Sequence, residues 1–307
     1  MKKLVIAIGG NAIEIPYQET TINEKLRNIN IVCKQIAELI KRGYKVLITH
    51  GNGPQIGNLL LQQMKTKVKR SLSEMTAITQ AEIGYLIQQS ILNFLNDAKV
   101  ATIITQVLVD INDPAFKNPT KPIGPLFAEN EVKEIASMLN YQYKKVSVKN
   151  LEGYRLVVPS PKPIKIIEEN VIRNLVEDNV IVIAGGGGGI PVIIKNGKYE
   201  GVDAVIDKDL TAELLARIIK AELLLIVTNV EKVKINFRKP NEKDLDTIKL
   251  NEAIKYMEEG HFEEGSMKPK IQACINFLEG GGEIAIITSM EKILEAIEGK
   301  AGTRIVK

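Results

Sequence analysis

The sequence contains very little cysteine or histidine. Its two cysteines, Cys33 and Cys274, each lie in a stretch with the apolar spacing of a helix. Such positions are typical of small buried hydrophobic side chains, so the sequence favours neither a disulfide framework nor a zinc site. The two histidines, His50 and His261, form no convincing Ser/His/Asp or Cys/His arrangement. His50 follows an apolar run, and we interpret it as bonding within that turn or to a ligand.

Long hydrophobic runs and one-sided charge are also absent. The apolar run Leu4–Ile8 is too short for a signal peptide, and no stretch approaches the roughly 18 apolar residues of a membrane span. The 41 basic and 37 acidic residues are interspersed, which does not indicate nucleic-acid binding. The densest basic run, Lys65–Arg70, lacks aromatic residues and is interpreted as solvated surface. We therefore expect a cytoplasmic protein that binds neither membranes nor nucleic acid.

Short aliphatic runs alternate with helical patterns along the chain. A strand over Leu4–Ile8, an amphipathic helix over Ile22–Arg42 and a strand over Val46–Thr49 predict a unit with parallel strands. Further helices are predicted over 76–96, 168–177, 210–220 and 268–279, and strands over 101–109, 180–184, 223–228 and 283–288. This alternation predicts an α/β fold with a mainly parallel, doubly wound sheet.

One proline-rich segment interrupts the alternation. Residues 112–125 read NDPAFKNPTKPIGP, and their four prolines cannot propagate a regular helix or strand. Residues 146–158 then resemble a hairpin that turns around Leu151–Gly153. We predict a single domain over 1–307 with a protruding lid subdomain inserted over 111–160.

Three glycine-bearing turns follow predicted strands. They read IAIGGNA (6–12), ITHGNGPQIG (48–57) and VIAGGGGGIPV (182–192). The carboxyl ends of parallel strands share one edge, where ligands bind, and glycine lets backbone N–H groups face an anion there. The three turns together predict one glycine-lined anion site.

The standard nucleotide motifs do not fit these turns. The chain has no G-x-x-x-x-G-K-[ST], which argues against a Walker-type NTPase. The five glycines match G-x-G-x-x-G only trivially, and Pro191 with a second apolar run follows where a helix should begin. A Rossmann dehydrogenase is therefore disfavoured.

Several lysines could supply the positive charge that phosphate chemistry needs. Lys208 lies between two aspartates at the start of a predicted helix, whose N-cap could be Asp209. Lys121 lies in the rigid proline-rich segment. Lys268 and Lys270 open another helix, where positive charge opposes the helix dipole. Taken alone, the Lys208 pattern favours a surface lysine beside a capping carboxylate, and Lys268 and Lys270 fit two surface lysines as well as an anion site.

At these motifs the sequence resembles the amino acid kinase family and, within it, the carbamate kinases. The resemblance runs almost end to end, through GGNA, ITHGNGPQIG, QAEIGYLIQQ, NDPAFKNPTKPIGP, VVPSPKP, IAGGGGGIPV, GVDAVIDKDL, VTNV and GSMKPKIQACINFLEGGGEIAIIT. It implies Mg²⁺-dependent homodimers of open αβα sandwiches. It also implies the reaction ADP + carbamoyl phosphate ⇌ ATP + carbamate, commonly run toward ATP at the end of arginine or agmatine breakdown.

The resemblance also implies roles for particular residues. Lys208 would stabilise the phosphoryl group in transfer, Asp209 would orient the lysines, Lys121 would close over the substrate phosphate, and Lys270 would contact the nucleotide phosphates. The N-terminal lobe would bind carbamate or carbamoyl phosphate, and the C-terminal lobe, about 180–307, would bind ATP or ADP. The implied substrate residues are Gly9, Gly10, Asn11, Gly51, Asn52 and Gly53; the implied nucleotide residues are Gly186, Gly187, Gly188, Gly189, Asn229, Val230, Ser266, Met267, Lys268 and Lys270. No side chain is assigned as a metal ligand.

The sequence departs from the family pattern at two positions. Lys268 replaces the usual glycine of GSMGPK, and Asn229 replaces an aspartate in VTNV. Both substitutions bear on nucleotide affinity. There are two alternative hypotheses. One is another small-molecule kinase of this fold, and the other is a non-catalytic paralogue that binds the same ligands.

Overall fold

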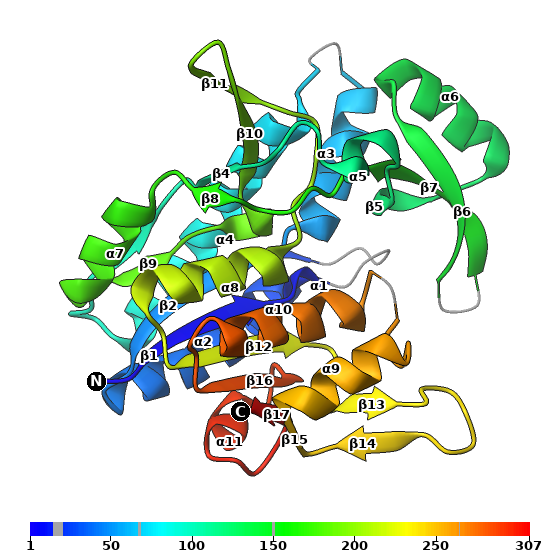
Figure 1. The fold of residues 1–307 in the computed structure, drawn as a ribbon. Coiled ribbons are helices and arrows are strands. Elements are labelled where there is room, and N and C mark those ends of the chain that lie inside the picture. The colour runs from blue at the N-terminus through cyan, green and yellow to red at the C-terminus, as the bar shows by residue number, and fades with distance from the viewer. Residues whose placement is uncertain (15–20, 67–68, 149–150, 264) are drawn as a thin grey trace.

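A mainly parallel sheet of eight strands forms the centre of the molecule (Figure 1). The computed structural model describes residues 1–14, 21–66, 69–148, 151–263 and 265–307. Strand β17 runs antiparallel to β16, and the other described pairs are parallel. In spatial order the strands are β15 (Thr247–Lys249), β17 (Thr303–Val306), β16 (Ile284–Ser289), β12 (Leu223–Thr228), β1 (Lys3–Ile8), β2 (Lys45–His50), β9 (Ile181–Ile183) and β3 (Val100–Thr102).

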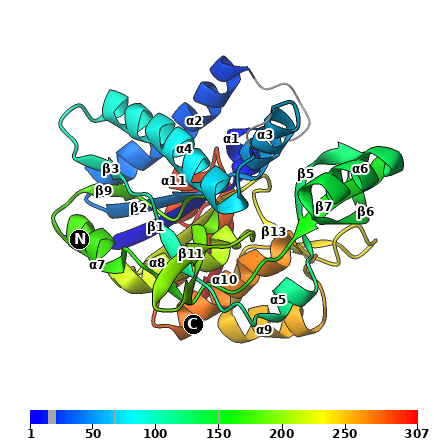
Figure 2. The same ribbon diagram turned by 90° about the horizontal axis from the view of Figure 1, so that it is seen from above.

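Helices cover both faces of this sheet, as Figures 1 and 2 show. Side chains of β1 alternate between two cores, so that Leu4 and Ile6 face one and Val5 and Ala7 face the other. The first core lies under α2 (Ile22–Lys41), α4 (Leu72–Phe94) and α11 (Ile293–Ile297); the second lies under α7 (Glu169–Glu177), α8 (Lys208–Ile219) and α10 (Met267–Glu279). The expected open αβα sandwich is confirmed.

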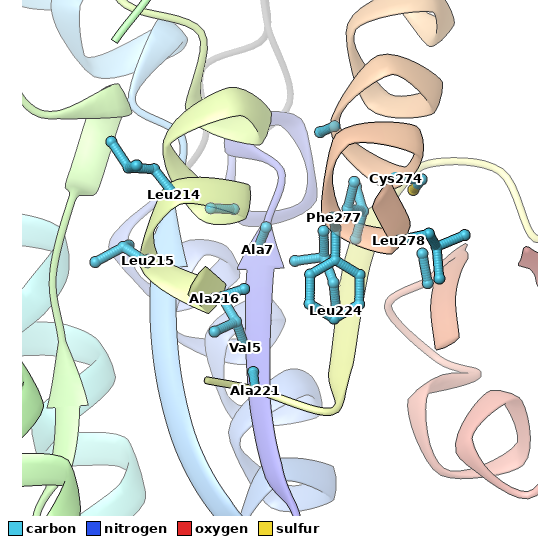
Figure 3. Close-up of a cluster of buried hydrophobic side chains, with 14 of the residues drawn as sticks. Val5, Ala7, Leu214, Leu215, Ala216, Ala221, Leu224, Cys274, Phe277 and Leu278 are labelled. Carbon is cyan, nitrogen blue, oxygen red and sulfur yellow. The ribbon is translucent and has the colours of Figure 1, made fainter. Parts of the chain in front are cut away.

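The second core shows why the strands read as uninterrupted apolar runs. Val5, Ala7 and Leu224 pack against Leu215 of α8 and Phe277 of α10 (Figure 3). A strand covered on both faces buries every side chain, so its sequence loses the polar alternation of a one-sided strand. Cys33 and Cys274 are buried with free thiols, as predicted. Among the described helices, none combines the length and apolarity needed to cross a membrane.

The predicted strand over 101–109 is wrong, because two strands of different sheets occupy this segment. β3 ends at Thr102 in the large sheet, and β4 (Gln106–Leu108) belongs to a second sheet with β8 (Lys165–Ile166), β10 (Ile190–Lys195) and β11 (Lys198–Gly201). Buried Gln80 holds the chain where it crosses from the large sheet to the second sheet. Its Nε2 donates to Thr105 O at 3.1 Å, and its Oε1 accepts from Thr105 N at 2.8 Å.

A three-stranded antiparallel sheet projects from the body beside α6 (Glu129–Leu139) (Figure 1). It contains β5 (Lys121–Phe127), β7 (Leu151–Val158) and β6 (Gln142–Val148), with α5 (Pro114–Lys117) preceding it. The prediction that residues 112–125 form no regular helix or strand is therefore wrong: Pro114 opens α5, and the prolines of β5 are tolerated because β5 is an edge strand. The predicted hairpin is present, but β7 already begins at Leu151. This sheet shares a hydrophobic core with α3 (Gly53–Met64), in which Ile56 and Leu60 meet Ile123 and Leu156.

The segment between β12 and α10 contains elements that the sequence patterns did not predict. β13 (Val233–Ile235) and β14 (Lys243–Leu245) form a separate antiparallel pair, and α9 (Leu250–Glu258) packs beside α10. These elements are short, and the strands are rich in charged residues, so they lack the apolar runs that identify the main strands.

Candidate active site

The three glycine turns meet at one edge of the large sheet. Gly10, which opens the short helix α1 (Gly10–Ile13), lies so near Gly51 that a Cβ on Gly51 would be 2.6 Å from Gly10 N. A Cβ on Gly187 would overlap the Asn52 amide. Backbone hydrogen bonds from Gly9 N to Val227 O (2.9 Å) and from Gly51 N to Ile8 O (2.8 Å) fix two of the turns to neighbouring strands.

The second turn leads directly into α3. Asn52 precedes Gly53, the first residue of this helix, but its side chain does not cap the helix. The Asn52 Nδ2 donates instead to Thr79 Oγ1 of α4 at 2.9 Å, and the side chain is almost completely buried. Asn11 lies in α1, and its side chain is outside the described part of the chain.

The five-glycine run is buried and packs against its own chain. Gly185, Gly187, Gly188 and Gly189 all have φ between +66° and +89°, a region that costs other residues about 1 kcal/mol or more. Three side chains donate to its carbonyls: Thr49 to Gly185 (2.9 Å), Gln80 to Gly186 (3.0 Å) and Thr211 to Gly188 (2.8 Å). Intramolecular packing therefore explains why this run contains no side chains.

Sequence reasoning missed the polar side chains that hold the run in place. Thr49 is the penultimate residue of the buried strand β2, and Gln80 occupies the buried face of α4. A buried polar side chain in an apolar stripe needs a hydrogen-bonding partner, so Gln80 was the available signal within the predicted helix over 76–96.

Two lysines share one buried carboxylate at the start of α8. Asp209 Oδ1 accepts a short hydrogen bond from Lys208 Nζ, and Asp209 Oδ2 lies 3.2 Å from Lys270 Nζ on α10. Asp209 is only 2% exposed. The Lys208 chain passes the second glycine turn, since a Cβ on Gly51 would lie 3.4 Å from Lys208 Cδ. The structure therefore brings Lys208, Asp209 and Lys270 together beside the turns.

The charges of this cluster depend on one another. Burial by itself would raise the pKa of Asp209, but Lys208 and Lys270 outweigh burial and hold this pKa below its ordinary value. Burial lowers the pKa of Lys208 despite the attraction of Asp209. The pKa of Lys270 is raised, because Asp209 and Asp207 outweigh the effect of its burial. Two cations around one carboxylate leave an excess of positive charge for an anionic ligand.

The predicted N-cap at Asp209 is wrong, and Asp207 is the N-cap of α8. Asp207 Oδ1 accepts a hydrogen bond from Asp209 N at 3.0 Å, which places Asp209 inside the first turn. Asp207 Oδ2 accepts from Lys121 Nζ at 2.8 Å. Lys121 is the first residue of β5, so this ion pair links the projecting sheet to α8.

His50 bonds within its own turn. The ring is 1% exposed, and its Nδ1 donates to Gly51 O at 3.1 Å. Burial, with a smaller contribution from Lys208, lowers the pKa of His50 to about 4. The imidazole is therefore neutral near pH 7 and supports the turn.

The residues implied for the nucleotide lie in two places. Asn229 and Val230 are exposed after β12. Ser266 is the N-cap of α10, and Met267 and Lys268 are the first residues of this helix, which packs against β12. Gly186–Gly189 follow β9, which β1 and β2 separate from β12. The structure thus places the glycine run beside the Asn52 turn, and it does not bring the run together with Asn229.

Comparison with known proteins shows the family of this chain. The model of the amino acid kinase family matches residues 2–289. The chain belongs to the amino acid kinase family. It is 47% identical to the carbamate kinase of Thermococcus kodakarensis, over 100% of both chains, and 46% identical to that of Pyrococcus furiosus, over 99% of both.

Solved structures of the amino acid kinase family agree with this relationship. The carbamate kinase of Giardia lamblia bound to AMP-PNP matches with a TM-score of 0.89 and 41% identity, covering 100% of this chain and 98% of that one. Likeness of sequence and fold over the full length of these relatives shows that this chain is a kinase, a phosphotransferase.

Proposed function

We propose that this member of the amino acid kinase family transfers a phosphoryl group from carbamoyl phosphate to ADP, giving carbamate and ATP. The observation that carries the proposal is the buried Asp209 carboxylate between Lys208 and Lys270, at the edge where the glycine turns meet. Phosphoryl transfer requires positioning and charge stabilisation more than a covalent nucleophile. The carbamate kinases of Thermococcus kodakarensis and Pyrococcus furiosus are 47% and 46% identical to this chain over 99% or more of their length.

In this mechanism the site acts through lysines and backbone N–H groups. An oxygen of the ADP β-phosphate attacks the phosphorus atom, and the bond from phosphorus to the carbamate oxygen breaks. Lys208 stabilises the charge on the phosphoryl group, Lys270 contacts the nucleotide phosphates, and Asp209 holds both ammonium groups. Carbamate leaves as an anion, so no general base is required.

The remaining roles follow the same division of the site. The glycines of the first two turns, with Asn11 and Asn52, are proposed to hold the phosphoryl group and carbamate, and Lys121 on the projecting 111–160 subdomain closes over the substrate phosphate. The lobe over about 180–307 binds the nucleotide near Asn229, Val230 and the start of α10. Gly186–Gly189 support that lobe where it adjoins the Asn52 turn.

Mg²⁺ is proposed to enter with the nucleotide. Among the described residues, no group of three or more His, Cys, Asp or Glu side chains is placed to hold a metal. Asp207 and Asp209 each pair with a lysine. These residues do not form a metal site of their own. We therefore expect oxygens of the nucleotide phosphates to bind Mg²⁺, which keeps several of its water ligands in such sites.

The cellular setting is proposed from the same relationship. We expect the reaction to run toward ATP in the cytoplasm, at the end of arginine or agmatine breakdown, in a homodimer. On α4, Ile78 and Tyr85 are 37% and 57% exposed, two turns apart on one face, and we propose this face as the subunit contact. Light scattering, which measures the molar mass in solution, tests whether the chain is a dimer.

A coupled assay that detects ATP formed from ADP and carbamoyl phosphate tests the proposed reaction. Turnover with carbamoyl phosphate and not with other acyl phosphates or phosphonates supports it. Turnover only with another phosphoryl donor assigns the chain to a different kinase of this fold, and ADP binding with no turnover assigns it to a non-catalytic role.

Replacing Lys121 by alanine should mainly weaken the binding of carbamoyl phosphate. The side chain projects from β5 toward α8, and its loss removes a cation from the phosphate side of the site. Steady-state kinetics should show a raised KM for carbamoyl phosphate with the KM for ADP unchanged. A change confined to ADP would show that the lysine serves the nucleotide instead.

The pH dependence of kcat/KM should show the deprotonation of Lys208. Burial lowers the pKa of this lysine from its ordinary value of 10.5, so its charge is lost as the pH rises through that lowered value. Because kcat/KM reports groups of the free enzyme, it should fall with an alkaline midpoint below 10.5. An active Lys208→Arg variant should lack this decline, since arginine stays charged; the same midpoint in both enzymes would contradict the assignment.

A further inference from the structure

We infer that Asp207 is a positioning residue, which holds Lys121 of the projecting sheet at the phosphate site. The inference rests on the proposed function and adds a residue to it. Lys121 and Asp207 are 86 positions apart in the sequence, and the fold brings their side chains to 2.8 Å. They are 27% and 14% exposed, so this ion pair lies largely out of solvent.

The Asp207 carboxylate is itself fixed by α8. Its Oδ1 accepts from Asp209 N at 3.0 Å as the N-cap of the helix, which leaves Oδ2 directed at Lys121 Nζ. The Asp207 backbone is also held, because its carbonyl accepts from Thr211 N at 3.2 Å. One aspartate therefore sets the helix start and the place of the lysine together.

Lys121 binds a different carboxylate from the other two lysines. Lys208 and Lys270 already pair with the two oxygens of Asp209, and Lys121 pairs with Asp207. Without Asp207, the conformational freedom of this long side chain would let its ammonium group leave the position. A lysine ammonium has three donors, so the N–H bound to Asp207 leaves two that can reach a phosphate.

The direction in which the KM for carbamoyl phosphate changes distinguishes a positioning role of Asp207 from a purely electrostatic one. If Asp207 acted only as a negative charge near the phosphate, its removal would tighten carbamoyl phosphate binding and lower KM. If it positions Lys121, its removal weakens the same binding and raises KM. The variant Asp207→Asn suits this test, because the asparagine Oδ1 can still accept from Asp209 N and cap α8.

We expect Asp207→Asn to raise the KM for carbamoyl phosphate roughly 3- to 10-fold, the scale of immobilising one long side chain. The KM for ADP and the melting temperature should not change. In a Lys121→Ala background the same substitution should have no further effect on KM, since the residue that it positions is gone. A lowered KM, an undiminished effect in the Lys121→Ala background, or a raised KM for ADP would each overturn the inference.

Glu152→Gln provides a matched control on the same sheet. Glu152 pairs with Lys145 at 2.6 Å, but it is 68% exposed, so this variant should keep wild-type kinetics. Absence of turnover in the wild-type enzyme would refute the proposed function and not the ion pair. The pair is tested without substrate by the ¹H–¹⁵N signal of the Lys121 ammonium group in ¹⁵N-lysine-labelled protein. Asp207→Asn should abolish or shift this signal and Glu152→Gln should not; an unchanged signal in Asp207→Asn would overturn the inference.

Discussion

Replacing Lys208 by alanine should lower turnover by about 100-fold or more, the order expected for losing one preorganised donor to a developing charge. Lys208 has a side chain that is only 12% exposed, lies beside the Gly51 turn and bonds Asp209. Its removal leaves Asp209 paired with Lys270 at 3.2 Å, so no buried charge is left without a partner. The fold should therefore survive while the chemical step is lost. The coupled ATP assay measures turnover, and circular dichroism and melting temperature measure folding.

Lys165→Ala is the matched control for this variant. Lys165 is 54% exposed and pairs with Glu169 at the surface, where such pairs contribute little. Its loss removes the same charge from the chain without touching the site. Turnover near the wild-type value in Lys208→Ala would contradict the role given to Lys208, and an equal loss in both variants would point to a general effect of charge.

Replacing Gly188 by alanine should have the largest effect on stability. Gly188 has φ of +88°, and a Cβ there would overlap the carbonyl oxygen of Ile206 and lie 2.7 Å from its carbonyl carbon. The obstructing atoms are backbone and cannot rotate away, so conformational strain adds to overpacking. We expect a loss of about 3 kcal/mol or more in the free energy of unfolding, measured by chemical denaturation. Turnover should fall as well, since Ile206 lies two residues before Lys208.

Gly43→Ala separates the two contributions to that loss. Gly43 has nearly the same backbone conformation, with φ of +89°, but a Cβ there would meet nothing within 4 Å. This variant should lose only the cost of a left-handed alanine, about 1 kcal/mol. Equal losses in the two variants would show that the backbone near Ile206 yields, and that the close packing of the glycine run matters little.

The central strands β1, β2, β9, β12 and β16 could be predicted from the sequence because they are largely buried on both faces, whereas the short strands β15 and β17 could not. Runs such as LVIAI in β1 have no polar interruption, and a helical spacing of apolar residues marks the longer helices α2, α4, α7, α8 and α10. The five-residue α11 is too short to show this spacing. The crossing from β3 to β4 could not be predicted in this way. It depends on Gln80, a side chain of a distant helix, and local pattern carries no information about that contact.

The candidate site was predictable in its parts but not in its connections. Resemblance selected Lys208, Asp209 and Lys270, and the structure joins them through one carboxylate. Neither residue pattern nor resemblance indicated that Asp207 caps α8 and binds Lys121, since both contacts depend on where the projecting sheet lies. The glycine run was expected to make room for a ligand, whereas its closest neighbours are the side chains and backbone of this chain.

The hydrophobic core shared by α3 and the projecting sheet couples two parts of the site mechanically. Ile56 and Leu60 of α3 pack with Leu156 of the sheet, and α3 begins at Gly53 of the second glycine turn. Close-packed interiors transmit displacement and absorb little of it. If the sheet tilts and withdraws Lys121, this packing would carry the Gly53 turn with it. The proposed lid and the proposed phosphate-binding turn would then move together, and neither would open alone.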